Sequence, residues 1–205
     1  GTSLGGARPK AAVIDGSRHL IAKFPLSTDT YNVVGAEALA MDLARRVGLN
    51  VAATQLVTVN GRDVLLVERF DRDRSDGRRR AVSALTVLGL NEYPDGRYAT
   101  YTDLAREIRK QFTKPRETLR ELFARIAFNM CVTNTDDHAR NHAAFVDDVA
   151  GHQELTLTPA FDLEPRPRSG DSAQQAMAYG GGGARETRFA ALVDAAGYYL
   201  LAVDQ

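Results

Sequence analysis

AFNMCVTNTDDHARN, residues 127–141, decides the fold: it is an apolar, helix-like run that ends in a group of polar side chains. Asp136 and Asn141 lie five positions apart within that polar end. A carboxylate can accept the proton of an attacking hydroxyl, and an amide oxygen a short loop away can hold a magnesium ion against phosphates. The stretch therefore predicts an active-site loop at the end of a core helix, with Asp136 as the base.

Protein kinases use the same separation between the base and the metal-binding amide of their catalytic loop. A second carboxylate follows downstream, because residues 157–162, LTPAFD, read as a strand that delivers Asp162. Kinases keep an aspartate that carries Mg²⁺ at the corresponding place. Two carboxylates and one amide around a single metal–nucleotide site favour phosphoryl transfer.

Residues 134–141, NTDDHARN, resemble the catalytic loop Asn-Thr-Asp-x-His-x-x-Asn of the HipA-like kinases, which are toxins of bacterial toxin–antitoxin systems. The resemblance covers about residues 1–165, since a Gly-rich loop, a strand lysine, a hinge, the catalytic loop and a second aspartate follow in order. It implies an α+β, two-lobed, protein-kinase-like fold. We expect a sheet-rich N-terminal lobe at 1–70 and a helical C-terminal lobe at 71–205. HipA-like toxins carry further regions at both ends, so we expect a fragment or a small, split member.

Composition limits the other classes of function. The 205 residues suffice for one two-lobed domain with a sizeable core. Lys+Arg and Asp+Glu both total 26, so no bulk attraction to nucleic acid or membranes is expected. The start lacks an apolar signal core and no apolar run approaches the ~20 residues of a membrane helix, which predicts a cytoplasmic enzyme. The single Cys131 lies among apolar residues and is expected to be a small core residue rather than a nucleophile.

The first ten residues combine glycine with positive charge ahead of a strand-like segment. Such glycines let backbone N–H groups approach an anion closely, although a flexible terminus would have the same composition. HipA-like kinases place a Ser-x-x-Gly-Ala-x-x-Lys loop over ATP and autophosphorylate its serine. The resemblance therefore implies that Ser3 is the autophosphorylation site. It implies that ATP is contacted by Gly5, Gly6, Ala7, Arg8 and Lys10.

Two hairpins and one helix are predicted for the N-terminal lobe. The dipeptides Asp15-Gly16 and Asn60-Gly61 mark the turns of the hairpins, and the helix between them should stop at Gly48. The predicted apolar stripe of this helix consists of Val33, Ala36, Ala40, Leu43, Ala44 and Val47.

Glu37 falls inside that stripe, and a carboxylate on a buried face needs a partner. Lys23 is the candidate, because it lies late in a mostly apolar strand predicted at residues 19–25. By analogy, the two would form the lysine-to-helix-glutamate pair of protein kinases, and Lys23 would contact the phosphates of ATP. A solvent-facing strand lysine is the alternative.

The second hairpin runs into ERFDR, residues 68–72, after which charge and glycine dominate up to Arg80. In HipA-like kinases this five-residue segment is the hinge between the lobes. The resemblance implies that backbone groups of Glu68, Arg69 and Phe70 hydrogen-bond adenine. A strand end followed by an exposed loop would use the same residues.

Helical patterns dominate the remainder of the chain. Residues 102–112 are expected to form a short helix, and Pro115 begins a longer one that leads into the catalytic loop. Residues 165–183 are rich in Pro, Gly and Ser and predict either a mobile loop near the substrate site or a linker. Residues 187–201 are expected to form one helix, interrupted at Gly197.

These features together predict an ATP- and Mg²⁺-dependent protein serine/threonine kinase, with Asp136 as base and with Asn141 and Asp162 holding Mg²⁺. The resemblance adds His138 and Arg140 to the nucleotide site. It also implies a growth-arresting toxin that acts on a protein substrate. A helix-turn-helix, HipB-like antitoxin would restrain it and bring the complex to operator DNA, so that DNA is contacted only indirectly.

Two alternatives stay open. A kinase fold without catalytic activity could serve only to bind an antitoxin or another partner. Asp136, Asp137, His138 and His142 could also be the metal ligands of a hydrolase. However, the glutamate that follows the first histidine in a zinc-protease helix is missing, and the amide of Asn141 suits magnesium better.

Overall fold

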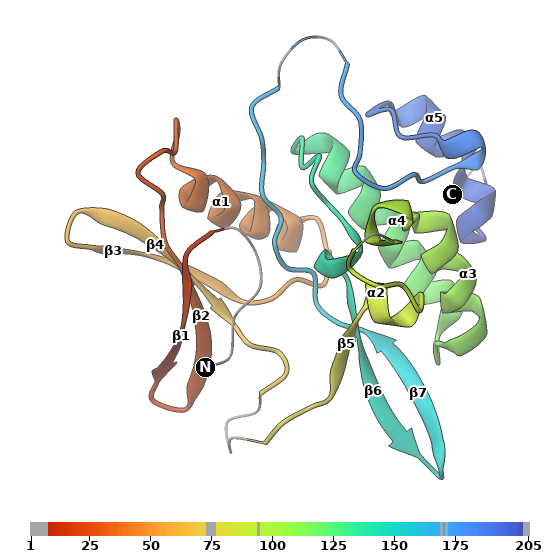
Figure 1. Cartoon of the computed structure of the whole chain (residues 1–205), viewed down its shortest axis with the longest axis horizontal. Coiled ribbons are helices and arrows are strands. Elements are labelled where there is room, and N and C mark those ends of the chain that lie inside the picture. The colour runs from red at the N-terminus through yellow and green to blue at the C-terminus, as the bar shows by residue number, and fades with distance from the viewer. Residues whose placement is uncertain (1–7, 73–76, 94, 169, 171, 203–205) are drawn as a thin grey trace.

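The computed structural model describes residues 8–72, 77–93, 95–168, 170 and 172–202. Within these residues, a four-stranded sheet with one helix beside it forms the N-terminal half, and four α-helices, short 3-10 helices and a three-stranded sheet form the C-terminal half (Figure 1). The segment that follows β7 runs between the two halves (Figure 1). The segment that carries Asp162 therefore lies where the halves meet.

The N-terminal sheet is antiparallel, with the strand order β1-β2-β4-β3. Each predicted hairpin is confirmed, since Asp15 lies opposite Arg18 and Val59 lies opposite Arg62, which leaves two-residue turns. Asn60 has a φ of 49°, in the left-handed region that short asparagine–glycine turns require. The strands are β1 (Lys10–Asp15), β2 (Arg18–Lys23), β3 (Thr54–Val59) and β4 (Arg62–Glu68).

Helix α1 (Val33–Arg46) packs beside this sheet and begins at Asn32, whose side chain accepts a hydrogen bond from the Gly35 N–H at 2.9 Å. The predicted stripe is only partly correct, because Leu43 and Val47 are exposed. Leu43 lies about 200° around the helix from the fully buried Met41, and therefore on the opposite side. The buried face consists of Val33, Val34, Glu37, Ala40, Met41 and Ala44.

The C-terminal half is built on α4 (Pro115–Cys131), which begins at the predicted proline. Three leucine and isoleucine side chains of α4, at positions 119, 122 and 126, are fully buried. Cys131 is exposed, so the prediction of a core cysteine was wrong. It lies about 140° around the helix from the buried Ile126 and points away from the core.

The other helices of this half are short. The predicted helix at 102–112 is present as α3, one residue earlier at both ends. The α-helices are α2 (Ala84–Val87), α3 (Tyr101–Gln111) and α5 (Phe189–Asp194), and the 3-10 helices are Asp95–Tyr98, Ala139–Asn141, Gly181–Gly183 and Ala196–Tyr199. The long final helix expected at 187–201 is therefore replaced by two short ones.

A three-stranded sheet also belongs to this half, where the sequence predicted helices and a single strand at 157–162. It has the order β5-β6-β7, with strands β5 (Ala81–Ser83), β6 (Ala143–Val149) and β7 (His152–Leu157). The strand predicted at 157–162 does not form, since β7 ends at Leu157 and no strand of this sheet includes the five residues that follow. Instead, Ala160 makes an isolated bridge, donating its N–H to the Asn50 carbonyl at 2.8 Å and accepting from the Ala52 N–H at 2.9 Å.

Part of the segment predicted to be a mobile loop or a linker, residues 165–183, belongs to the core. Met177, Ala178 and Tyr179 are buried, and the Ala178 carbonyl accepts a hydrogen bond from the Tyr101 N–H at 2.8 Å. The Tyr199 hydroxyl donates to the Tyr179 carbonyl at 2.8 Å. Apolar side chains spaced among the small residues fix this segment despite its composition.

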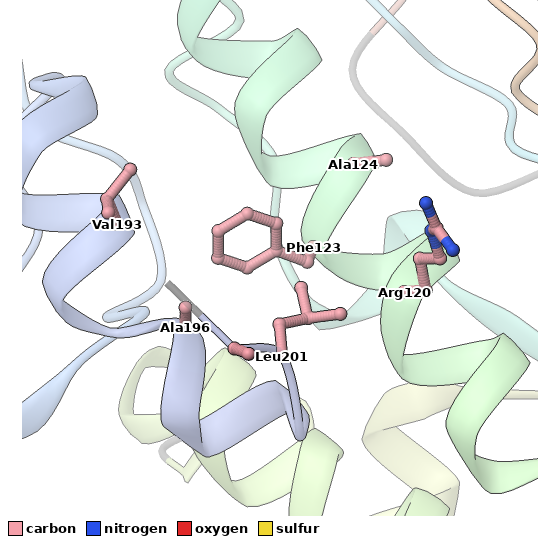
Figure 2. A pocket seen from close by; sticks show the side chains of 7 residues that line it. Arg120, Phe123, Ala124, Val193, Ala196 and Leu201 are labelled. Atoms are coloured by element: carbon pink, nitrogen blue, oxygen red, sulfur yellow. The ribbon is translucent and has the colours of Figure 1, made fainter. Parts of the chain in front are cut away.

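An apolar pocket of about 180 Å³ lies between α4 and the C-terminal segment. Figure 2 shows Phe123 of α4 facing Val193, Ala196 and Leu201 across it. None of the residues predicted to form the active site lines this pocket. Among the helices that the structure describes, none is both long enough and apolar enough to cross a membrane.

Candidate functional site

Lys23 joins the two halves of the molecule. Its Nζ lies 2.5 Å from Oε1 of Glu37 on α1 and 2.5 Å from Oδ1 of Asp162, which follows β7. Lys23 and Glu37 are 7% and 1% exposed, so this ion pair is almost entirely removed from water. The pairing predicted between Lys23 and Glu37 is present, and the structure adds Asp162 to it.

Lys23 and Asp162 stabilise each other's charge, whereas burial disfavours the charge of Glu37. Burial, the largest effect on Lys23, lowers its pKa, but the carboxylates of Glu37 and Asp162 together outweigh burial and hold the pKa above its usual value. Burial raises the pKa of Asp162, yet the charge of Lys23 outweighs it and holds that pKa below its usual value. Burial raises the pKa of Glu37, whose second oxygen Oε2 has no hydrogen-bond partner in the part of the chain described.

Asp162 has a left-handed backbone, with a φ of 62°. Non-glycine residues in this region cost about 1–3 kcal/mol and persist only where the surroundings fix them. Lys23 fixes the side chain of Asp162, and the next residue, Leu163, is buried in the cluster that contains Met41 and Phe128. The turn keeps the carboxylate of Asp162 36% exposed beside the buried lysine.

The predicted catalytic loop follows α4 directly. Thr133 reverses the chain with a φ of 55°, and the Asn134 N–H and side-chain amide both donate to Asn129 of α4, at 2.9 and 3.0 Å. Asp136 is exposed, and its Oδ2 accepts a hydrogen bond from Nη2 of Arg166 at 2.7 Å. The predicted base therefore stands at the surface of a loop whose start is fixed to a core helix.

Asp137 lies next to Asp136 but is 1% exposed. Its Oδ2 accepts hydrogen bonds from Nδ2 of Asn129 and Nε2 of His142, each at 2.8 Å, and from the hydroxyl of Tyr101. Burial raises the pKa of Asp137, but the neighbouring His142 and Tyr101 outweigh it and hold the pKa below its usual value. This network connects α3, α4 and the loop.

The sequence did not reveal this network, because two adjacent aspartates give no indication of which one is buried. The network also bears on the alternative of a metal-dependent hydrolase, since Nε2 of His142 is already bonded to Asp137. Within the described ranges, no group of three or more His, Cys, Asp or Glu side chains is arranged to hold a metal ion.

The remaining residues of the loop differ in their surroundings. Asn141 is buried at the end of the 3-10 helix, and its N–H donates to the His138 carbonyl at 2.8 Å. Nδ1 of His138 is buried without a hydrogen-bond partner in the described chain, and its Nε2 lies 3.3 Å from Nη2 of Arg140. Arg140 is exposed and forms an ion pair with Glu92 at the surface. The amide of Asn141 and the carboxylate of Asp162 are oxygen donors of the kind that Mg²⁺ prefers.

Two of the predicted phosphate-loop residues are described. Arg8 forms an ion pair with Asp29 at 2.7 Å and lies 3.7 Å from Glu164. Lys10 of β1 lies directly opposite Lys23 of β2, and burial together with the charge of Lys23 lowers the pKa of Lys10. The other predicted residues of the loop, Ser3, Gly5, Gly6 and Ala7, lie outside the described residues.

The predicted hinge is largely engaged within the protein. The N–H of Glu68 donates to the Ala53 carbonyl at 2.8 Å, and the N–H of Arg69 donates to the His19 carbonyl at 2.9 Å. The ring of Phe70 packs against those of two further phenylalanines, at positions 145 and 161. The expectation that backbone groups of this segment hydrogen-bond adenine therefore does not hold for two of its N–H groups. The N–H groups of Glu68 and Arg69 are not free to hydrogen-bond adenine.

Comparison with known proteins agrees with this geometry. A family model described as the HipA-like C-terminal domain matches residues 2–204. "Putative kinase Y4mE" of Sinorhizobium fredii is 33% identical over 152 residues, which are 70% of this chain and 33% of that relative. Toxin YjjJ of Escherichia coli K12 is 27% identical over 184 residues, which are 84% of this chain and 40% of that relative. The chain thus spans a third to two fifths of the curated relatives that it matches.

Solved structures show the same fold. The Shewanella oneidensis toxin HipA, in a complex with HipB and operator DNA, superposes with a TM-score of 0.76 over 99% of this chain and 53% of its own, at 20% identity. The Helicobacter pylori proinflammatory kinase CtkA superposes with a TM-score of 0.60 over 75% of this chain and 54% of its own, also at 20% identity. The predicted α+β, kinase-like fold is confirmed, and the chain belongs to the family of HipA-like C-terminal domains.

Proposed function

We propose that this chain is an ATP- and Mg²⁺-dependent protein serine/threonine kinase of the HipA-like toxin type. The observation that carries the proposal is the bridge from Lys23 to Glu37 and Asp162. Arg166, four residues after Asp162, donates to Asp136 and so joins this segment to the catalytic loop. A buried lysine held by a helix glutamate and by a second, partly exposed carboxylate is the arrangement that positions nucleotide phosphates in kinases.

The residues divide the work of phosphoryl transfer. Lys23 would hold phosphate oxygens, while Asn141 and Asp162 would hold Mg²⁺. When bound, Mg²⁺ supplies positive charge against the phosphate oxygens. Asp136 would accept the proton of the substrate hydroxyl, and its exposure suits a group that must reach a protein substrate. Asp137 would take no part in proton transfer, because its carboxylate is buried and its Oδ2 accepts three hydrogen bonds from the fold.

The relatives support a proposal about partners. The solved HipA of Shewanella oneidensis is bound to HipB and operator DNA, and the Escherichia coli relative is named a toxin. We infer that this chain also acts as a toxin and is bound by a helix-turn-helix, HipB-like antitoxin, with DNA contacted only through that partner. The residue that the kinase would phosphorylate in itself is Ser3.

Mass spectrometry after incubation with Mg-ATP tests the proposal. Wild type is expected to gain one phosphate on Ser3 and to phosphorylate added protein, whereas Asp136→Asn should do neither. Asp148→Asn, at an exposed aspartate of β6, is the matched control and should behave as wild type. Equal transfer by wild type and Asp136→Asn would refute the kinase assignment. Absence of transfer by wild type would favour the alternative of a binding module without catalytic activity.

A further inference from the structure

We propose that a hollow beside Asp136 is a subsite for an anionic side chain of the protein substrate; the inference rests on the proposed kinase function. The hollow measures about 200 Å³. It is lined by Thr133, Thr135, Arg166, Pro167, Arg168, Ala173 and Gln174, and we call it the threonine–arginine subsite.

The subsite adjoins the place where the substrate hydroxyl must bind. Thr135 immediately precedes Asp136 in the chain, and Arg166 both lines the subsite and donates to Oδ2 of Asp136 at 2.7 Å. A serine or threonine positioned at Asp136 would therefore place a neighbouring substrate residue over the subsite. A substrate side chain bound in the subsite would lie within a few residues of the serine or threonine that accepts the phosphate, so the subsite can influence which substrates are chosen.

The walls of the subsite are fixed by backbone hydrogen bonds. The Arg166 N–H donates to the carbonyl of Thr133 at 3.3 Å, which joins the catalytic loop to the segment after Asp162. On the other wall the Ala173 carbonyl accepts from the Thr187 N–H at 2.8 Å. Thr133 is a β-branched residue with a φ of 55°, a conformation that such residues adopt rarely and that occurs mostly where function requires it.

The chemistry of the lining favours an anion. Hydroxyl groups of two threonines, the amide of Gln174 and the guanidinium groups of Arg166 and Arg168 are all donors, and no described residue of the lining is acidic. Arg166 uses Nη2 on Asp136, and the rest of its planar fork can bind a carboxylate or a phosphate. The lining therefore matches the side chain of glutamate, aspartate or a phosphorylated serine.

Nearby carboxylates limit the strength of this preference. Asp136 forms an ion pair with Arg166, and Oε1 of Glu164 lies 4.0 Å from Nη2 of the same arginine. The pair of Arg166 and Asp136 is about half exposed, and such pairs contribute little net free energy, so an incoming anion can compete for the guanidinium. An anion that draws Arg166 toward itself also frees an oxygen of the base. We therefore expect a preference of about tenfold, as for one charge-assisted hydrogen bond, rather than an absolute requirement.

The test measures binding separately from transfer. Fluorescent peptides built on glycine and glutamine, with alanine in place of the single acceptor serine, would carry one glutamate, one phosphoserine or neither at each of the three positions on either side. Anisotropy titrations would use the whole chain with Mg²⁺ and a non-hydrolysable ATP analogue. Wild type is expected to bind one position-specific anionic peptide about tenfold more tightly than the neutral peptide.

Variants of Arg168 decide whether the subsite is responsible. Arg168→Gln should remove most of the preference and Arg168→Lys should keep part of it, while Arg46→Gln, at an exposed arginine of α1, should leave it unchanged. The glutamate and phosphoserine arms decide which anion is preferred. Equal binding of anionic and neutral peptides by wild type, or an intact preference in Arg168→Gln, would overturn the inference.

The outcome can be separated from that of the proposed function. The same peptides with serine restored would be incubated with Mg-ATP and examined by mass spectrometry. A binding preference without transfer would support the subsite and refute the kinase. Phosphate transfer without a binding preference would support the kinase and refute the subsite.

Discussion

The carboxylate of Asp137 accepts three hydrogen bonds from side chains of the fold, whereas the carboxylate of Asp162 is held by one lysine. Asp137 is fully buried, but the side chain of Asp162 is 36% exposed. Oδ2 of Asp137 is already occupied by three donors of the fold, whereas the carboxylate of Asp162 can exchange part of its ion pair for a ligand. The difference teaches that, of these two acids, Asp137 fixes the loop and Asp162 is available for chemistry.

Removal of the buried carboxylate of Asp137 should have the largest effect on stability. Asp137→Ala leaves the buried donors of Tyr101, Asn129 and His142 without their acceptor. Loss of one member of a buried charged network typically costs about 3–5 kcal/mol. Urea unfolding should show that loss, or the variant should fail to fold, whereas Asp136→Ala at the exposed neighbour should change the free energy of unfolding by about 1 kcal/mol or less. Equal stability of Asp137→Ala and wild type would contradict the comparison.

Removal of the lysine should mainly affect phosphoryl transfer. Lys23→Met takes away the charge that joins Glu37 and Asp162 and would hold phosphate. We expect the transfer rate to fall about 100-fold or more, which corresponds to about 2.7 kcal/mol of transition-state stabilisation. Lys110→Met, at an exposed lysine of α3, serves as the matched control. A Lys23→Met protein that is folded by circular dichroism and transfers phosphate at the wild-type rate would show that Lys23 is only structural.

The smallest expected effect is the contribution of the Lys23–Asp162 ion pair to stability, which should depend on pH. The folded pKa of Asp162 is lowered, so its contribution is present above the unfolded aspartate value of about 3.9 and is lost as pH falls through the folded pKa. The folded pKa of Lys23 is raised, so its contribution is present below the unfolded lysine value of about 10.4 and is lost as pH rises through the folded pKa. Stability should therefore contain a component that is constant between these limits.

Urea unfolding of wild type and Asp162→Asn across that pH range measures the component. Because the carboxylate is partly exposed, the difference should be about 1 kcal/mol or less near neutrality and should vanish in acid. Asparagine tolerates the left-handed backbone, so the substitution isolates the charge. A difference that persists unchanged below the unfolded aspartate pKa would assign the effect to something other than the ion pair.

Local patterns in the sequence were sufficient for much of the fold. Asn60-Gly61 and Asp15-Gly16 predicted both hairpins because each dipeptide suits a two-residue turn. Pro115 predicted the start of α4 for a similarly local reason. The predicted partner of Glu37 was also present, because a charge on a buried helix face leaves few ways to be satisfied.

Features that depend on contacts between distant segments could not be predicted in this way. The role of Asp137 depends on Tyr101, 36 positions away, and nothing near Asp137 in the sequence indicates that contact. The hairpin of β6 and β7 was missed because its apolar and polar residues also fit helices and loops. The burial of Tyr179 was masked by the small residues around it, since composition cannot show which few side chains reach a core.

Calorimetric titration of Mg-ATP into wild type, Asp162→Asn and Asp136→Asn tests most directly the claim that the Lys23 bridge is a nucleotide site. Wild type and Asp136→Asn should bind with similar affinity, because the base is not a metal ligand. Asp162→Asn should bind at least about tenfold more weakly and should lose the dependence of affinity on Mg²⁺. Indistinguishable titrations of wild type and Asp162→Asn, or no heat of binding in wild type, would contradict the account.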